Sequence, residues 1–205
     1  MAYRKTERVE AKLADNRARI LQTARRLVAE SGFRDAQMAA IAAAAGLATG
    51  SVYRYFPSRA ELFAEVLAIT SRREVQVIEA IADSGGPAAA RLADGVRAFA
   101  SRALRARQLA YSLIAEPVDP EIDSARLQYR HALGEAFERI LGDGVRSREF
   151  PSQNVEAGAA CVVGALLEGL VGPLAPRARG RDSGERATEA IVAFCLRAVG
   201  AKPRS

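Results

Sequence analysis

Apolar residues recur at helical spacing along almost the whole chain. Between residues 10 and 31, Ile20, Ala24, Leu27 and Val28 follow this spacing, with charged residues between them. No segment shows the sustained alternation of apolar and polar residues that is typical of a half-buried strand. The pattern therefore predicts an all-α fold class with about nine helices.

Glycine, proline and capping residues divide this pattern into separate helices. Gly32 and Gly46 are expected to end the first two, Pro57 the third, and Gly142 and Gly144 the helix that starts near residue 120. Ser58 and Glu61 have the S-x-x-E spacing of a capping box, which predicts a long fourth helix. The first four helices are expected at about 10–31, 36–45, 49–56 and 59–82. The later ones are expected at about 87–105, 107–115, 120–141, 152–170 and 184–199.

Positive charge is concentrated at the N-terminal end. Residues 1–60 contain 11 Lys and Arg against 5 Asp and Glu, whereas residues 61–205 contain 19 of each, so the first 60 residues hold the whole excess of +6. A localised positive charge favours a polyanionic partner, because neutralising phosphates releases condensed counterions. The alternative is a solvated basic surface, and charge alone does not separate the two.

Residues 36–56 form two short helical segments around Gly46. Ile41 in the first segment and Val52 and Phe56 in the second are placed to face inward. This arrangement predicts a helix-turn-helix, in which the second helix enters the major groove of DNA while the first braces it. Two helices around a glycine also occur in many other all-helical proteins, so the detailed residues must decide.

The residues around this glycine form a pattern that is specific to one protein family. The run AAGLATGSVYRYF over 44–56, followed by SRAEL over 58–62, closely resembles the TetR (tetracycline repressor) family, and residues 20–42 fit the same pattern. The resemblance implies an N-terminal three-helix DNA-binding head in residues 1–60 and a larger helical ligand-binding and dimerisation body in residues 61–205. Family members are mostly repressors that leave their operators when a small molecule binds. The implied partners are therefore a double-stranded DNA operator, a second copy of the chain and a small-molecule effector.

The resemblance also implies which residues contact DNA. They lie at the start of the supporting helix, along the recognition helix and at the start of the fourth helix. They are Gln37, Thr49, Gly50, Ser51, Tyr53, Arg54, Tyr55 and Arg59. Arg54 can bind guanine through two hydrogen bonds, with a phosphate contact as the alternative, and the tyrosine hydroxyls can donate to phosphates unless their rings pack in the head core.

Two positions depart from the family pattern. Ala36 and Ala48 stand where Thr or Ser usually caps a helix. Asp35 is expected to cap the supporting helix from one residue earlier. Ala48 leaves the recognition helix without a side-chain cap, at a cost of about 1 kcal/mol.

Two apolar segments near the C-terminal end, 157–170 and 190–198, are rich in small residues. In the family the last two helices pair with their copies as a four-helix interface, and burial within one subunit is the alternative. The candidate dimer-interface residues are Val155, Ala159, Val162, Val163, Leu166, Leu170, Ile191, Phe194 and Cys195.

A ligand pocket is expected within residues 87–145. The candidate lining residues are Phe99, Tyr111, Leu113, Tyr129, His131 and Phe137, with ordinary core or surface packing as the alternative for each.

Other features argue against several classes of protein. No run approaches 20 uninterrupted apolar residues and the N-terminus is charged, so we expect a cytoplasmic protein outside the membrane. Cys161 and Cys195 are expected to be small buried thiols rather than a disulfide. With His131 as the only histidine and no zinc pattern, no metal or cofactor is expected.

No nucleophile motif or phosphate-binding loop predicts an enzyme. The interpretations that remain are a ligand-responsive DNA-binding repressor, a ligand-independent DNA-binding regulator and an all-helical protein-interaction module.

Overall fold

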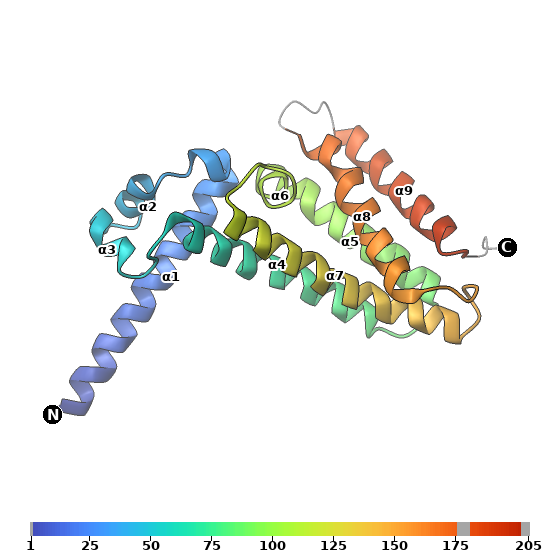
Figure 1. Ribbon diagram of the computed structural model, residues 1–205, viewed down its shortest axis with the longest axis horizontal. Coiled ribbons are helices and arrows are strands. Elements are labelled where there is room, and N and C mark those ends of the chain that lie inside the picture. Colours follow the sequence, from blue (N-terminus) through green and yellow to red (C-terminus); the bar gives the residue numbers. More distant parts are fainter. Residues whose placement is uncertain (1, 176–180, 202–205) are drawn as a thin grey trace.

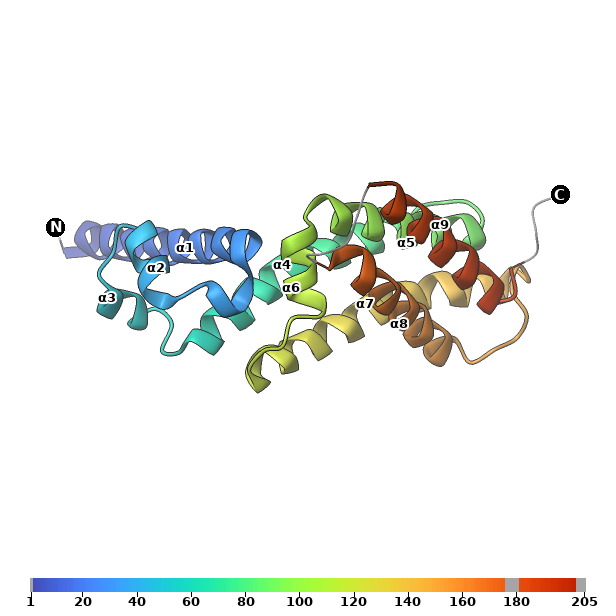
Figure 2. The ribbon, with the colours of Figure 1, turned by 90° about the horizontal axis from the view of Figure 1, so that it is seen from above.

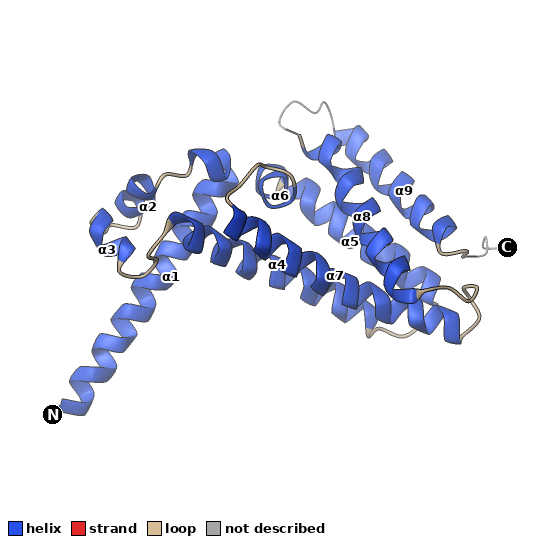
Figure 3. Cartoon of the chain, in the orientation of Figure 1, coloured by secondary structure: helices blue, strands red, loops and turns tan. Residues whose placement is uncertain are grey.

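The computed structural model describes residues 2–175 and 181–201, with the side chains of residues 9–175 and 184–201. Within these residues the chain forms helices and turns, without a strand (Figure 3). The elements are α1 (Ala2–Asp35), α2 (Met38–Ala44), α3 (Thr49–Tyr53), α4 (Arg59–Ala82), α5 (Ala88–Arg105), α6 (Arg107–Ile114), α7 (Pro120–Arg146), α8 (Val155–Leu174) and α9 (Arg181–Ala198). The predicted all-helical fold is confirmed.

The molecule is elongated, with small and large groups of helices at opposite ends. Helices α1 to α3 lie at one end, and α5, α8 and α9 lie at the other (Figures 1 and 2). The long helices α4 and α7 run side by side and connect the two groups. The N-terminal part of α1 projects beyond the other helices (Figure 1).

The head, formed by α1 to α3 and the first turns of α4, has its own apolar core. Ile20, Ile41 and Val52 are fully buried there, and the rings of Phe33 and Phe63 meet edge to face with centroids 5.2 Å apart. Two residues of α6, Leu109 and Leu113, belong to the same core. The apolar interior of the head therefore continues into α6.

The body is formed by α4 to α9 around a second core, to which Val96, Phe137 and Leu166 contribute fully buried side chains. Of the described helices, α8 alone has the length and mean apolarity of a membrane span. It carries Glu156 and Glu168 and packs against α7 and α9, so its apolar residues serve the core of the body.

The helix boundaries follow the predicted start and stop signals with four main differences. Helix α1 starts at Ala2 rather than near residue 10, although Gly32, with φ +84°, interrupts its helical geometry where a stop was predicted. Helix α3 ends at Tyr53, so Arg54 and Tyr55 follow the helix instead of lying on it. Helix α8 runs on to Leu174 instead of ending near residue 170.

The fourth difference is in α7, which continues to Arg146 instead of ending before Gly142. A Cβ atom on Gly144 would lie 2.2 Å from Cδ2 of Phe150. This glycine therefore allows the Phe150 ring to pack directly on the helix backbone, and it is not a helix stop. The chain reverses instead at Arg148, whose φ of +61° is left-handed.

The capping predictions have mixed outcomes. Ser58 caps α4 by accepting a hydrogen bond from the N–H of Glu61 at 3.0 Å, as predicted. The prediction that Asp35 caps α2 is wrong, because the N-cap position is Gln37 and no side chain caps that helix. Helix α3 begins at Ala48 without a side-chain cap, as predicted.

Candidate nucleic-acid interface and internal cavity

The turn between α2 and α3 depends on Gly46, which has a φ of +65°. Its N–H donates to the carbonyl of Ala43 at 3.0 Å, and the N–H of Leu47 donates to the carbonyl of Ala42 at 2.9 Å. This closes α2 in the way that a left-handed glycine allows, and it directs the chain into α3. Residues 38–53 therefore form the predicted helix-turn-helix.

Helix α3 has one buried face and one exposed face. Val52 is fully buried and Phe56 nearly so, and together they fix the segment against the head core. Thr49, Gly50 and Tyr53 face outward, and the side chain of Tyr53 is 46% exposed. The outward face is thus free to contact a large partner.

Arg54 and Tyr55 extend this surface beyond the end of α3. Arg54 is exposed, and with half-buried Ser51 it lines a groove between α3 and α1. The hydroxyl of Tyr55 accepts a hydrogen bond from Nδ2 of Asn16 at 3.0 Å, which ties the end of the motif to α1. The same hydroxyl can still donate its own proton to an acceptor.

Gln37 and Arg59 flank the motif differently. Gln37 is exposed and its Nε2 donates to the carbonyl of Arg34 at 3.0 Å. The guanidinium of Arg59 donates to the carbonyl of Phe33, lies 3.4 Å from Oδ2 of Asp119 and stacks on the Phe63 ring. Arg59 thus joins α4 to the end of α1 and to the start of α7. Its contact with DNA stays a prediction, as do those of the other seven residues.

Comparison with known proteins identifies the motif. Residues 20–66 match the family described as "Bacterial regulatory proteins, tetR family". The head of this chain therefore contains a TetR-family domain over these residues. No curated protein matches it.

Solved structures share the fold of the whole chain. The fatty acid degradation regulator FadR from Bacillus halodurans has a TM-score of 0.77 at 18% identity, over 91% of this chain and 97% of its own. FadR from Bacillus subtilis, in complex with stearoyl-CoA, has a TM-score of 0.71 at 18% identity, over 91% and 99%. RolR, in complex with resorcinol, has a TM-score of 0.70 at 22% identity, over 94% and 91%.

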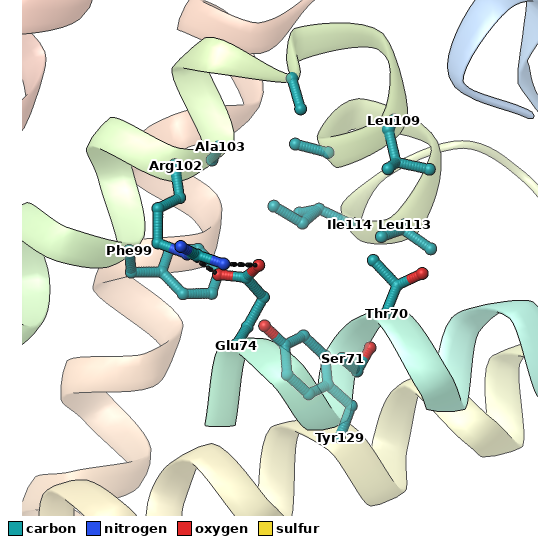
Figure 4. A pocket seen from close by; sticks show the side chains of 12 residues that line it. Thr70, Ser71, Glu74, Phe99, Arg102, Ala103, Leu109, Leu113, Ile114 and Tyr129 are labelled. Atoms are coloured by element: carbon teal, nitrogen blue, oxygen red, sulfur yellow. Dashed lines mark hydrogen bonds and ion pairs between the residues drawn. The ribbon is translucent and has the colours of Figure 1, made fainter. Parts of the chain in front are cut away.

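The body contains a partly open cavity of about 60 Å³. Helices α4, α5, α6 and α7 all contribute to its wall (Figure 4). The lining residues are Thr70, Ser71, Glu74, Phe99, Arg102, Ala103, Ala106, Leu109, Ala110, Leu113, Ile114 and Tyr129.

The cavity brings together three of the six predicted pocket residues, Phe99, Leu113 and Tyr129. The other three do not line it. Tyr111 packs half-buried against the body core, and His131 is exposed in a surface groove between α7 and α8. Phe137 is fully buried next to Gly95, where a Cβ atom would lie 3.1 Å from its Cε1.

Sequence reasoning missed the polar residues of the cavity. Arg102 of α5 and Glu74 of α4 form a two-point ion pair, with distances of 2.7 Å from Nε to Oε2 and 2.9 Å from Nη2 to Oε1. Burial, with the nearby Glu74 carboxylate, raises the pKa of Tyr129, so its hydroxyl remains a hydrogen-bond donor. The only feature of the sequence that could have indicated these polar wall residues is the charge at positions 74 and 102 of two amphipathic helices.

The candidate dimer residues lie mostly inside the subunit. Phe194 is 53% exposed and Val155 is half-buried, whereas the other seven are buried in the core of this chain. The seven are Ala159, Val162, Val163, Leu166, Leu170, Ile191 and Cys195. They pack against α5, α7 and each other, because the apolar residues of α8 cover more than one face of the helix.

A different set of residues forms the outward face of α8 and α9. On α8 these residues are small, and on α9 Phe194 is the large apolar one. They are Ala157, Ala160, Cys161, Gly164, Ala190, Phe194 and Ala198. The prediction that both cysteines are buried is wrong for Cys161, which is exposed, although both are free thiols. We name this outward surface the α8–α9 face.

Proposed function

We propose that this TetR-family protein is a cytoplasmic, homodimeric repressor, and not an enzyme, that binds a near-palindromic operator and leaves it when a small molecule fills the cavity. The observation that carries the proposal is the division of the helix-turn-helix into two faces. Val52 holds α3 to the head, while Thr49, Tyr53 and Arg54 point outward. Hydroxyl and guanidinium groups on a short helix of this kind suit phosphate and base-edge contacts in the major groove.

The α8–α9 face supports the homodimer. Small side chains such as Ala157, Ala160 and Gly164 allow another helix to approach closely, and exposed Phe194 offers a large apolar group to cover. A twofold-symmetric dimer would present two heads, and such a pair reads two half-sites in opposite orientations. The operator is therefore expected to be nearly palindromic.

The position of α6 supports release by a ligand. Leu109 and Leu113 line the cavity and also belong to the apolar core of the head. A molecule that enlarges the cavity would displace α6 and thereby alter how the head packs. RolR with resorcinol and FadR with stearoyl-CoA have the same fold and were solved with small molecules bound.

Selection of bound sequences from a random pool of DNA duplexes tests the proposal. The expected result is a near-palindromic consensus, with affinity that falls steeply as salt concentration rises. Failure to enrich any sequence, together with no binding to duplex DNA at low ionic strength, would contradict it.

A ligand-independent regulator is the second candidate, because the cavity is small. A screen of compounds against the operator complex separates the two, since only the ligand-responsive repressor is released. An all-helical protein-interaction module would instead bind through apolar contacts that respond little to salt.

A further inference from the structure

The cavity has a polar side and an apolar side. Leu109, Leu113 and Ile114 of α6 form the apolar side, and Phe99 of α5 adds an aromatic ring. Figure 4 shows the Tyr129 hydroxyl beside the Glu74 side chain and the Ser71 hydroxyl on the other side of the tyrosine ring, with the α6 residues across from them. A molecule that fills the cavity therefore meets hydrocarbon over most of its surface and polar groups over a small part.

Ser71 has a buried hydroxyl that no protein group satisfies. Thr70, its neighbour on α4, donates its hydroxyl to the carbonyl of Val66 at 2.8 Å, as hydroxyl side chains in helices commonly do. Ser71 is only 4% exposed, yet its Oγ has no hydrogen-bond partner among the described residues. A buried polar group without a partner is costly, and a ligand that hydrogen-bonds to it recovers that cost.

Tyr129 provides a second free donor on the same side. Its hydroxyl makes no hydrogen bond within the described part of the chain, and its ring lies between the cores of head and body. Ser71 and Tyr129 come from different helices, α4 and α7. Because both hydroxyl-bearing side chains line the same cavity, one ligand can reach both of them.

The charges in the cavity wall are already paired. The guanidinium of Arg102 makes two hydrogen bonds to the carboxylate of Glu74, and the two side chains are 30% and 23% exposed. A carboxylate ligand that bound Arg102 would have to displace Glu74, which would then lose its partner in a partly buried place. The pair therefore offers no net charge to attract an ion.

We propose that the effector of this cavity is a small uncharged molecule with an apolar body and one hydroxyl or carbonyl oxygen, which Ser71 and Tyr129 bind by hydrogen bonds. This inference rests on the proposed ligand-responsive function and adds the chemical class of the ligand. The volume of about 60 Å³ sets the size. Since an engineered apolar cavity of about 150 Å³ binds benzene, a single ring is the upper limit here and requires the α6 side chains to move.

Calorimetric titration of the full-length protein without DNA tests the class with three matched probes. Phenol has a ring and a neutral hydroxyl, benzoate has a ring and a negative charge at neutral pH, and toluene has a ring alone. We expect phenol to bind about 10-fold more tightly than benzoate or toluene, because it alone satisfies both hydroxyls without adding charge.

Variants assign that preference to the two hydroxyls. Ser71→Ala and Tyr129→Phe should each weaken phenol binding by about 3- to 10-fold, which is the range for one hydrogen bond, and leave toluene binding unchanged. Ser84→Ala is the control, because Ser84 lies outside the cavity and its hydroxyl donates to the carbonyl of Ile81. It should leave phenol binding unchanged. Ser71→Ala removes no protein hydrogen bond and should therefore fold normally.

Several results would overturn the inference. These are benzoate binding as tightly as phenol, toluene binding as tightly as phenol, no binding of phenol at millimolar concentration, or equal losses of phenol binding for Ser84→Ala and Ser71→Ala. Operator binding is measured separately on the same preparations. If the protein binds its operator but lacks the ligand preference, only this inference fails. If the preference holds but no DNA is bound, the proposed function fails.

Discussion

The carboxylate of Glu116, just beyond α6, accepts a hydrogen bond of 2.9 Å from the backbone N–H of Phe33 in the head. Its second oxygen accepts another of 2.9 Å from the N–H of Arg34. Both donors follow Gly32, where a Cβ atom would lie 2.7 Å from Oε2 of Glu116. Position 32 therefore needs glycine, both for its left-handed φ and for the close approach of Glu116. The two hydrogen bonds of Glu116 connect the end of α6 to the end of α1.

Replacing Glu116 by alanine should weaken this joint. Two backbone N–H groups would lose a charged acceptor, and we expect the free energy of unfolding to fall by about 1–3 kcal/mol. Urea denaturation followed by circular dichroism measures the change. Glu138→Ala removes an exposed carboxylate from α7 and serves as the control. Equal effects of the two substitutions would show that the joint does not stabilise the fold.

Arg54→Ala should reduce binding to the selected operator more than binding to random DNA. A two-point contact to guanine contributes about 1–3 kcal/mol of discrimination, so the ratio of the two affinities should fall accordingly. Fluorescence anisotropy with labelled duplexes measures both affinities. Arg72→Ala removes the same charge from an exposed position on α4 and should change neither. Equal losses on both duplexes for Arg54→Ala would assign it to the phosphate backbone.

Two glycines of α7 should respond in opposite ways to alanine. Gly144→Ala places a methyl group 2.2 Å from the Phe150 ring, and we expect a loss of about 2 kcal/mol or more in stability. Gly134→Ala meets nothing within 4 Å and should stabilise the helix by about 0.5–1 kcal/mol. Thermal unfolding of the pair provides the measurement, and a stable Gly144→Ala variant would contradict this account of the Phe150 packing.

Phe194→Asp should convert a dimer into monomers. The substitution puts a charge in the middle of the α8–α9 face, where a partner would have to desolvate it. Sedimentation equilibrium should then show one subunit, and operator affinity should fall because two heads are no longer linked. Ile69→Asp, at an exposed apolar position on α4, is the control and should remain dimeric. A dimeric Phe194→Asp protein would place the interface elsewhere.

Asp143 should make stability depend on acidic pH. A hydrogen bond from Arg91 holds the pKa of Asp143 below its ordinary value. A lowered folded-state pKa stabilises the protein above the unfolded pKa, near 4, and this contribution is lost as the pH falls through the folded value. Asp143→Asn should therefore be less stable than the parent protein at neutral pH, by about 1 kcal/mol or less given its partial exposure.

Urea titrations between about pH 7 and pH 2 test this dependence, and the two proteins should converge at the acidic end. Asp94→Asn on α5 provides the comparison, because Asp94 makes only an exposed pair with Arg97 at 3.8 Å. A difference between Asp143→Asn and the parent that stays constant down to the lowest pH would contradict the assignment.

The spacing of apolar residues and the positions of glycine, proline and capping residues predicted the helices well. In an amphipathic helix, that spacing alone indicates which face is buried. The helix-turn-helix was also predictable, since Gly46, Val52 and Phe56 act within one short segment. Gly142 and Gly144 misled the prediction, because a glycine that admits a distant ring looks the same in sequence as one that ends a helix.

The cavity and the dimer face were less predictable because both depend on how helices pack together. Glu74 and Arg102 are 28 residues apart, and only the crossing of α4 and α5 brings them together. On α8, nearly every residue is apolar or small, so periodicity could not tell the face toward α7 from the face toward solvent. The structure buries Val162 and Leu166 within the subunit, which is the alternative that the sequence left open.

The sharing of Leu109 and Leu113 between the cavity wall and the interior of the head has a consequence for dissecting the protein. A fragment cut after residue 60 would lose these two side chains together with Leu62 and Phe63, all of which bury the inner surface of α1. We therefore expect the first 60 residues to be unstable when produced alone. The head and the body would then unfold as one cooperative block.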